Sequence, residues 1–459
     1  MPLDTLLCAL LLTTQISTAT NFMTIEESWR VGLREGFAIA SARDSVRTAD
    51  IQVLAARSEF FPKITPSFSR RENERSWSIT GYQALPGLGG ALLAERTSRT
   101  FEGVQTPAFR LSDTSFMWSQ PLLRGLGPNA SLYGLRNARR VRQAQERNLI
   151  LSKQRFMVDI ARAYYQTVAQ RELLSVARQS ATRSEVLRRA SEARLDVGLS
   201  NKLDVYRAQL SEAQAEQSAV QAEAALQSAI ETFHLLLGKP LDDPIEPAPV
   251  TIGSTPLDDL PPIETLVQTA FLRRLDLLEV KDQIDDARRT ASLSRQNLLP
   301  DISLNLRFTE QKSAGSAGPL VVTNRRWESF FSASLPLERA ADVAQLQLSN
   351  LDVTARERGY QQRRYEVEAE VRSTHRALTA LFRSIETQEG AIDIADKQLQ
   401  LANLRYQRGL ASNFDVVDAE GNLIAARGAL AQLVSAYRIA RLDLERVIGR
   451  LDVDIGLDQ

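Results

Sequence analysis

At 459 residues the chain is too long for one compact core, and its length alone indicates about three domains. The 56 basic and 56 acidic residues cancel to a formal net charge of zero, so the overall charge does not favour nucleic acid as a partner. Hydrophobic residues at 43% and charged residues at 24% exclude a disordered chain and a polytopic helical membrane protein.

The N-terminal residues 1–19 are similar to a short secretory signal peptide. The stretch Leu6–Leu12 is apolar, small residues follow it, and cleavage is expected near Ala19. The segment departs from a typical signal because it carries Asp4 and lacks a basic residue, so a mis-assigned start is the alternative. Cys8 follows a leucine where lipidation sites need a small residue, and lipidation is therefore not expected.

The order of sequence landmarks in the first half of the chain recurs once in the second half. Around Gly198 and Gly409 the two copies are offset by 211 residues. Residues that match at this offset are Gly198 and Gly409, Asp204 and Asp415, and Gly238 and Gly449. We predict two structural repeats, 20–239 and 263–459, each with a helix, a strand pair, a long helix and a return helix. The Pro-rich stretch 240–262 between them is expected to be an extended linker.

Segments that alternate apolar and polar residues predict two strands in each repeat. They lie at 63–71 and 109–123 in the first repeat, and at 301–310 and 327–337 in the second. The sequence has no run of 18 apolar residues, so the chain could enter a membrane only as strands, and these have the length of tilted membrane-spanning strands. We expect one face of them to contact lipid, through Phe116, Trp118, Ile302, Leu304, Leu306, Phe308, Trp327 and Phe331.

The connections within the two strand pairs are long. Residues 71–106 connect the strands of the first pair and residues 311–326 those of the second, and such lengths are typical of extracellular loops. The alternative is two ordinary hairpins that pack on a soluble core. Four strands cannot close a barrel, and an open sheet edge is not viable in lipid. Strands that span a bilayer would therefore require several copies of the chain, with three copies giving twelve strands.

Two proline-free stretches predict helices far longer than those of globular proteins. One runs from about 133 to 197 and the other from about 339 to 408, roughly 100 Å each at 1.5 Å per residue. Return helices are expected at 201–237 and 412–449, pairing with the long helices as coiled coils. Their heptad-like seams are Leu203, Tyr206, Leu210, Ala213, Val220 and Ala224, and then Val416, Leu423, Leu430, Val434, Tyr437, Leu444 and Ile448.

The sequence offers no support for an enzyme. It has two histidines and one cysteine, and none of the common catalytic or nucleotide-binding motifs. No metal site, cofactor or catalytic residue is therefore predicted. A structural coiled-coil protein of the cell envelope is one interpretation of the long helices.

In this order, the segments resemble the TolC-like outer membrane efflux proteins, from about residue 24 to residue 449. The most specific matches are the turns between long and return helices, together with the stretch 120–125 at a strand exit. The turn residues are Val197, Gly198, Leu199 and Ser200, and then Arg408, Gly409, Leu410, Ala411 and Ser412. Each match is weak alone, and together they are specific because their order is preserved.

The resemblance implies a fold that is mostly α, with a membrane β-barrel contribution. A homotrimer would close a twelve-stranded barrel in outer membrane lipid above a helical tunnel in the periplasm. It implies the channel of a tripartite efflux or type I secretion system, with no nucleic acid bound. The implied partners are a periplasmic membrane-fusion adaptor, which meets the turn residues, and an inner-membrane pump of the RND, ABC or MFS type.

The resemblance also implies a gate at the periplasmic mouth. Asp415 and Asp418 fall on positions of an aspartate ring, and Asp204 and Tyr406 fall on positions that hold the closed state. Ala411 stands where the family's best-known member has an arginine, so that salt bridge is not expected here. The alternative for the aspartates is helix N-terminal placement, and for Tyr406 a place in a helix seam.

Overall fold

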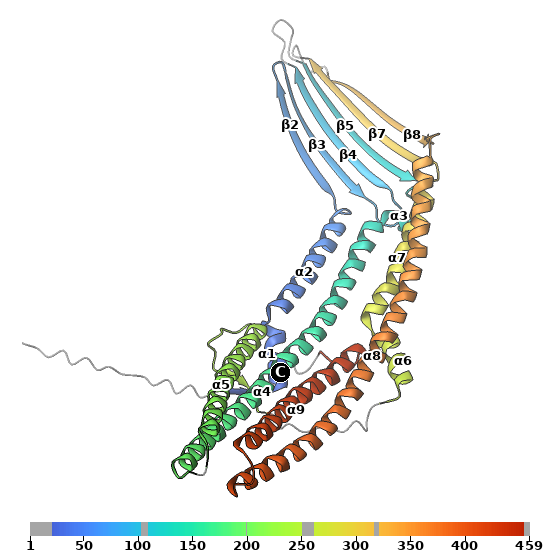
Figure 1. The fold of residues 1–459 in the computed structure, drawn as a ribbon. Coiled ribbons are helices and arrows are strands. Elements are labelled where there is room, and N and C mark those ends of the chain that lie inside the picture. Colours follow the sequence, from blue (N-terminus) through green and yellow to red (C-terminus); the bar gives the residue numbers. More distant parts are fainter. Residues whose placement is uncertain (1–20, 102–108, 199, 250–260, 316–320, 454–459) are drawn as a thin grey trace, which may run out of the picture. The chain divides into compact units, whose positions relative to one another are not determined.

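The structure is a computed structural model that describes residues 21–101, 109–198, 200–249, 261–315 and 321–453 (Figure 1). The predicted signal peptide, the turn residue Leu199 and residues 250–260 of the predicted linker lie outside these ranges. The chain divides into two compact units. The helical unit comprises Met1–Ala40, Lys153–Thr265 and Val371–Gln459, and the sheet unit comprises Ser41–Ser152 and Leu266–Glu370.

Helices dominate the described part of the chain. In order they are α1 (Ile25–Glu35), α2 (Phe37–Ser58), α3 (Pro128–Ser131), α4 (Tyr133–Asp196), α5 (Lys202–Leu237), α6 (Ile263–Arg273), α7 (Leu275–Asn297), α8 (Ala340–Gln407) and α9 (Asn413–Val447). The long helices α4 and α8 have 64 and 68 residues, and the return helices α5 and α9 have 36 and 35. This confirms the predicted fold class of long antiparallel helices combined with strands.

Matched glycines end the helices of both halves. Gly198 and Gly409 have φ of +76° and +73°, and Gly238 and Gly449 have +73° and +71°. Only glycine adopts this left-handed conformation without strain, and it turns the chain out of a helix. The same backbone turn therefore stands at both ends of each return helix, which explains why these glycines recur at one offset in the sequence.

The core of the helical unit lies where α1, α4 and α5 meet. Trp29 donates its indole N–H to the carbonyl oxygen of Met157 over 2.9 Å, and Tyr164 packs edge-on against Phe233. A Cβ on Gly32 would lie 2.4 Å from the side chain of Ile160, so α1 packs closely against α4. Beside this core, β1 (Asn21–Met23) pairs in parallel with β6 (Ile245–Pro247), which lies inside the predicted linker.

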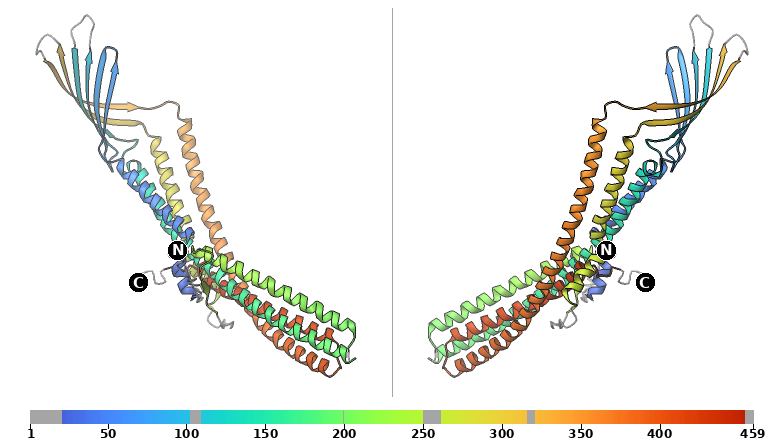
Figure 2. Two further views of the ribbon diagram at one scale, coloured as in Figure 1. Left: turned by 90° about the vertical axis from the view of Figure 1, so that its left-hand side faces the viewer. Right: turned by 90° about the vertical axis from the view of Figure 1, so that its right-hand side faces the viewer.

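The sheet unit contains a six-stranded antiparallel sheet in the order β2-β3-β4-β5-β7-β8 (Figures 1 and 2). The strands are β2 (Lys63–Arg71), β3 (Glu74–Ala84), β4 (Ala91–Phe101), β5 (Phe109–Pro121), β7 (Asp301–Gly315) and β8 (Val321–Ser334). Four of them lie where the sequence predicts strands. The expectation of four strands per chain is wrong, because β3 and β4 occupy most of the segment 71–106 that was assigned to a loop.

The pattern of β4 explains why this hairpin was missed. Its residues Leu92 and Leu93 are adjacent, and the face of Leu92 continues with Ala94, Arg96 and Ser98. Apolar residues therefore do not alternate along β4, and period-two alternation is the main sequence signal for a strand. β4 is a strand because it forms backbone hydrogen bonds with β3 and β5 along its whole length, which its local sequence does not predict.

One face of the sheet carries the residues predicted to contact lipid. The register places Trp118 opposite Leu306, and Phe116 opposite Phe308, which in turn lies opposite Trp327. The remaining predicted residues, Ile302, Leu304 and Phe331, share this face. The other face carries polar residues together with a row formed by Tyr82, Leu93 and Met117. Hydroxyl pairs such as Ser303 and Ser332, 2.6 Å apart, lie across neighbouring strands on this face. No helix within the described residues is long and apolar enough to cross a membrane.

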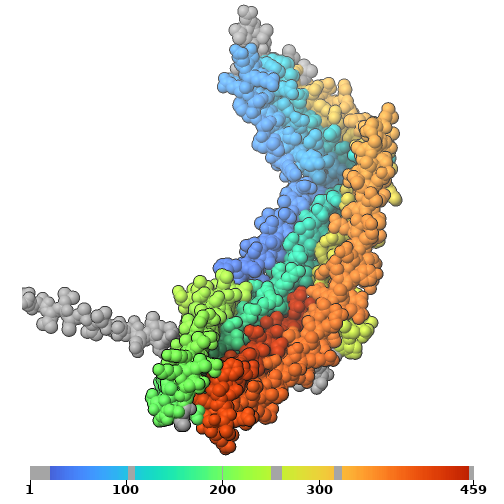
Figure 3. All heavy atoms as spheres, in the orientation of Figure 1, coloured from blue at the N-terminus to red at the C-terminus, as the bar shows by residue number. Residues whose placement is uncertain are grey.

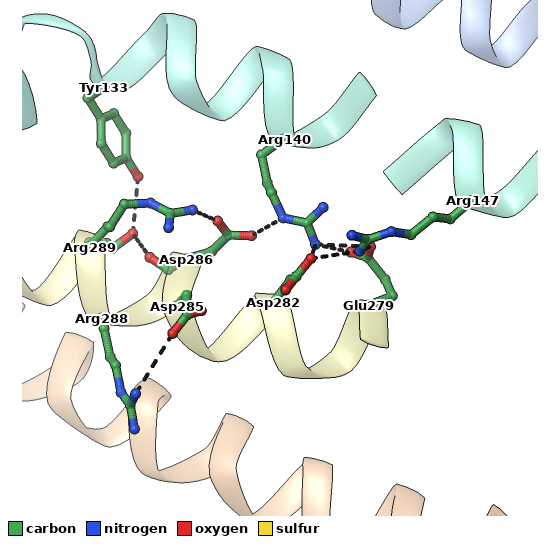
Figure 4. A network of polar contacts seen from close by, with 10 residues as sticks. Tyr133, Arg140, Arg147, Glu279, Asp282, Asp285, Asp286, Arg288 and Arg289 are labelled. Atoms are coloured by element: carbon green, nitrogen blue, oxygen red, sulfur yellow. Dashed lines mark hydrogen bonds and ion pairs between the residues drawn. The ribbon is translucent and has the colours of Figure 1, made fainter. Parts of the chain in front are cut away.

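Charged side chains join α4 to α7 within the sheet unit (Figure 4). Arg140 lies 2.9 Å from Glu279 and 3.3 Å from both Asp282 and Asp286, and Arg147 lies 2.7 Å from Asp282. The Arg140 side chain is only 11% exposed, so water screens these attractions weakly. The network fixes the register of α4 against α7 below the sheet.

Arg140→Ala is expected to lower the free energy of unfolding by about 2 kcal/mol, since it leaves a carboxylate cluster with Arg147 as its remaining cation on α4. The matched control is Arg288→Ala on α7, whose side chain is 59% exposed and should cost under about 0.5 kcal/mol. Urea unfolding of the detergent-solubilised protein, followed by circular dichroism, measures both. Equal costs for the two variants would contradict the assignment of the network.

Candidate functional site at the helical tips

The helical hairpins α4–α5 and α8–α9 end in two neighbouring turns, which are the green and orange-to-red ends in Figure 3. We call residues 197–204 the first tip and residues 406–418 the second tip. The two hairpins lie side by side in both views of Figure 2. All the predicted gate residues belong to these tips, so the tips are the candidate functional site.

Backbone hydrogen bonds define the second tip. Gly409 donates to the carbonyl of Tyr406 over 3.0 Å, and Leu410 donates to that of Arg405 over 2.9 Å, which together form a Schellman turn. Ser412 then starts α9, and its backbone N–H and hydroxyl both donate to the Asp415 carboxylate, over 2.8 and 3.0 Å. Asp415 therefore caps α9, as the alternative interpretation of this residue expected.

The described residues of the first tip also combine a glycine turn with a helix cap. Gly198 donates to the carbonyl of Leu195 over 2.9 Å. Asn201 caps the N-terminus of α5, and its side chain accepts from the Asp204 backbone N–H over 2.9 Å. The Asp204 carboxylate accepts a hydrogen bond from the Ser200 hydroxyl over 3.2 Å. Asp204 is half-buried, and the contacts of its carboxylate are within its own tip.

Tyr406 connects the second hairpin to the first. Its side chain is buried at 9% exposure, and its hydroxyl lies 3.1 Å from that of Ser191 on α4. Arg194, one turn further along α4, donates to the Tyr406 carbonyl over 2.7 Å and to that of Gln407 over 3.4 Å. Its guanidinium also lies 4.5 Å from the centre of the tyrosine ring, a cation–π distance.

Asn413 completes this connection from α9. It is fully buried, and its side-chain amide donates to the Ser191 hydroxyl over 3.2 Å and to the Asp204 carbonyl over 3.0 Å. Its carbonyl oxygen Oδ1 is buried without a hydrogen-bond partner within the described residues. A buried unsatisfied oxygen costs free energy, so this contact is less stable than its two hydrogen bonds suggest. We call Ser191, Arg194, Tyr406 and Asn413 the tip link.

Apolar packing and one charged pair extend the contact above the tip link. Val416, Ala419 and Leu423 of α9 pack against α8 in one buried cluster. Beside it lies a cavity of about 330 Å³ between the hairpins, lined in part by Tyr406, Arg183 and Glu420. Burial raises the pKa of Glu420, and Arg183, 2.9 Å away, opposes that rise.

The outer surface of the tips is exposed. Val197 and Leu410 are 67% and 72% exposed, and the side chains of Asp415 and Asp418 are exposed as well. Asp418 accepts a weak hydrogen bond from Asn422 one turn later, over 3.4 Å. Other predicted tip residues in the described part are Gly198, Ser200, Arg408, Gly409, Ala411 and Ser412. No group of metal-ligating side chains occurs among the described residues.

The two predicted coiled-coil seams differ in the structure. On α9, Val416 and Leu423 are buried at 5% and 1% exposure, as a seam requires. On α5, Leu203, Tyr206 and Leu210 are 53%, 64% and 59% exposed, so their pairing with α4 was predicted wrongly. The face of α5 that packs inside the chain carries smaller residues, namely Val205, Ala208 and Ala215.

The structure brings Tyr406 into the tip link but leaves the Asp204 carboxylate outside it. The predicted site residues do not include Ser191, Arg194 and Asn413, which bond Tyr406 and Asp204. Ser191 and Arg194 lie within a long charged helix, where such residues usually face water. Asn413 follows the cap residue Ser412 and carries no periodic signal of its own, so the sequence offered little by which to find it.

Comparisons with known proteins give one consistent result. Residues 33–239 and 266–450 match the family described as outer membrane efflux protein. Among solved structures, CusC has a TM-score of 0.70 at 19% identity, with 94% of this chain and 93% of that chain covered. VceC of Vibrio cholerae has 0.70 at 17% identity, covering 93% and 96%. The open state of the Neisseria gonorrhoeae MtrE outer membrane channel has 0.66 at 15% identity, covering 94% and 90%. No curated protein matches the chain significantly.

Proposed function

The chain belongs to the outer membrane efflux protein family, and from this premise we propose that three copies form a passive export duct gated at the helical tips. As a member of the family it is an outer membrane efflux channel whose helices lie in the periplasm. This membership sets aside the alternative of a structural coiled coil without a channel. The proposed duct would let cargo pass without catalysing a reaction.

The observation that supports an assembly of several copies is the exposed apolar surface of the helical hairpins. Besides the α5 residues Leu203, Tyr206 and Leu210, the α8 residues Ile394 and Leu401 are 68% and 55% exposed. Two such stripes on one hairpin pair fit a ring of copies, in which the stripe of one copy covers that of the next. A closed ring of this kind encloses a tunnel.

The exposed tips are the surface for a partner in the periplasm. Val197 and Leu410 present apolar side chains at turns whose backbones are fixed by the glycines, a shape suited to the helical hairpins of a membrane-fusion adaptor. Through the adaptor the duct would serve an inner-membrane pump of the RND, ABC or MFS type, in tripartite efflux or in type I secretion. Export of the chain itself would use the signal peptide predicted at residues 1–19.

The gate would combine the tip link with the acidic residues beside it. The tip link ties the α8–α9 hairpin to α4 and α5 within one copy, which holds the mouth narrow. Asp415 and Asp418 of three copies would form a ring of six carboxylates there. Such a ring attracts cations and repels anions when the mouth is narrow. The state of MtrE described as open fits a mouth that widens.

Asp415→Asn/Asp418→Asn is expected to lower the cation-to-anion permeability ratio about threefold to tenfold, because it removes the fixed charge at the mouth. Asparagine retains an oxygen that can accept the Ser412 hydrogen bonds, so the cap of α9 is preserved. Reversal potentials across planar bilayers under a KCl gradient measure the ratio.

The control for this variant is Asp44→Asn/Asp352→Asn, which neutralises two exposed carboxylates of the sheet unit. It should leave the permeability ratio unchanged. If the ratio of the tip variant also stays at the wild-type value, the gate role of Asp415 and Asp418 is excluded.

A further inference from the structure

We propose that the β3–β4 hairpin is part of the barrel wall, so that each chain supplies six strands and three copies close an eighteen-stranded barrel. The inference rests on the proposed trimer. It changes the barrel that the sequence implied, from twelve strands to eighteen. It also assigns an interface between copies, namely β8 of one copy against β2 of the next.

The hairpin is inserted into the hydrogen-bonded ladder and does not lie on its surface. β3 pairs with β2 from Arg71 opposite Glu74 to Lys63 opposite Tyr82. β4 pairs with β5 along the whole of its length, from Ala91 opposite Ser119 to Phe101 opposite Phe109. β2 and β5 are therefore separated by two full strands. A loop folded into the lumen or above the barrel would leave β2 and β5 as neighbours.

Both faces of the hairpin continue the faces of the sheet. In register, Leu92 lies beside Trp118, and Ala94 lies beside Phe116, on the face predicted to contact lipid. Trp77 lies opposite Phe68 on that face. The other face carries hydroxyls, and Ser67 and Ser69 of β2 lie 2.7 Å from Ser78 and Ser76 of β3. This two-sided pattern is that of a wall between lipid and water.

The turn between β3 and β4 is built into the base of the sheet. Leu85 donates to the carbonyl of Gly90 over 2.7 Å, and the buried Gln120 at the end of β5 donates to the carbonyl of Leu88 over 3.0 Å. Gly89 has φ +81°, and a Cβ there would lie 2.2 Å from the backbone oxygen of Gly125. The turn can approach the exit of β5 this closely only with glycine at that position.

Closure of a barrel from several copies requires that the edge strand of one copy can pair with the edge strand of the next. Within the described residues, β2 pairs only with β3 and β8 only with β7, so each has an open edge, which lipid does not tolerate. Six alternating strands make β8 of one copy antiparallel to β2 of the next. Phe68 of β2 and Phe331 of β8 are 72% and 71% exposed on the lipid face of these two edge strands. Three copies then give an even-numbered antiparallel barrel.

The consequence is a wider outer section of the duct. Barrel diameter grows roughly linearly with strand number, so eighteen strands give a diameter about 1.5 times that of twelve. Barrels of sixteen to eighteen strands enclose an aqueous channel. The hydroxyls of β3 and β4 on the face away from lipid, Ser76, Ser78, Thr80 and Thr97, would line the added part of this channel.

Quenching of tryptophan fluorescence by brominated lipids tests the place of the hairpin. In one variant Trp77 is the only tryptophan, through Trp29→Phe, Trp118→Phe and Trp327→Phe. In a second variant Trp118 of β5 is retained in place of Trp77, as a position that lies in the wall for either strand number. In a third, all four tryptophans are replaced by phenylalanine and Tyr82→Trp reports on the lumen face of β3. Each protein is reconstituted in vesicles of brominated or unbrominated phosphatidylcholine.

We expect Trp77 to be quenched to the same extent as Trp118, and the residue at position 82 to be quenched much less. Quenching of Trp118 without quenching of Trp77 would overturn the proposal and leave the proposed function intact. Absence of quenching at both positions would mean that the sheet does not lie in lipid, and the proposed duct would fail with it.

A second measurement uses the unsubstituted protein, in case a phenylalanine variant does not assemble. Electron cryomicroscopy of the wild-type protein in lipid nanodiscs counts the copies and the strands. Three copies with eighteen strands, and β8 beside β2 of the next copy, support the proposal. Three copies with twelve strands in the wall overturn it while retaining the trimer, and any other number of copies contradicts the trimer itself.

Discussion

An Arg194→Ala channel is expected to open about 30-fold more readily than the wild-type channel, because the change removes about 2 kcal/mol of contacts that hold the tips together. Arg194 makes two hydrogen bonds to backbone carbonyls of the second tip, and its guanidinium covers the Tyr406 ring at 4.5 Å. These contacts join separate hairpins, so they are lost when the hairpins move apart. Single-channel recordings in planar bilayers measure the open probability and the conductance.

Arg189→Ala is the matched control, since Arg189 lies on the same helix, is 69% exposed and, among the described residues, pairs with Glu185 of its own helix. It should leave the open probability at the wild-type value. A second variant, Tyr406→Phe, removes the hydroxyl bonded to Ser191 and should have a smaller effect in the same direction as Arg194→Ala. If Arg194→Ala and Arg189→Ala behave alike, the tip link does not hold the closed state.

The sequence predicts the positions of the two turns because a turn between helices requires particular residues. A chain that reverses between two helices needs a residue with positive φ and then a helix cap, and Gly409 followed by Ser412 and Asp415 supplies both. The contacts between the tips were not predictable in this way. They depend on which faces of α4 and α9 meet, and Asn413 contacts Ser191, a residue more than two hundred positions away in the sequence.

Periodicity showed that α5 and α9 each have an apolar stripe, but it could not show what covers each stripe. Leu423 is buried against α8, whereas Leu210 is 59% exposed in the single chain. Both obey the same spacing, since a seam within a chain and a seam between copies require the same residues. The strands show a similar limit. The sequence pattern of a single barrel strand is weak. In β4, Arg96 interrupts the apolar face, so the alternation does not predict this strand.

Asp276→Ala is expected to cost about 3 kcal/mol of the free energy of unfolding, because it removes a partner from a buried arginine. The Arg274 side chain between α6 and α7 is 8% exposed and lies 2.8 Å from Asp276, which also lies 2.6 Å from Arg363 of α8. Glu370, 2.6 Å from Arg274, remains in the variant. Asp285→Ala is the control, since Asp285 is 60% exposed and 3.8 Å from Arg288, and it should cost under about 0.5 kcal/mol.

The contribution of Asp276 should depend on pH in a defined direction. Burial alone would raise the pKa of its carboxyl, but hydrogen bonds from Arg274 and Arg363 reverse this and hold the pKa well below its usual range. A folded-state pKa below the unfolded value of about 3.9 means that the stabilisation is complete above that pH and is lost as the pH falls toward the folded-state pKa. Urea midpoints of the wild type and Asp276→Ala should therefore differ by a constant amount above about pH 5 and converge below about pH 4. A difference that grows on acidification would show that Asp276 is protonated more readily in the folded state, and the assigned contacts would then be wrong.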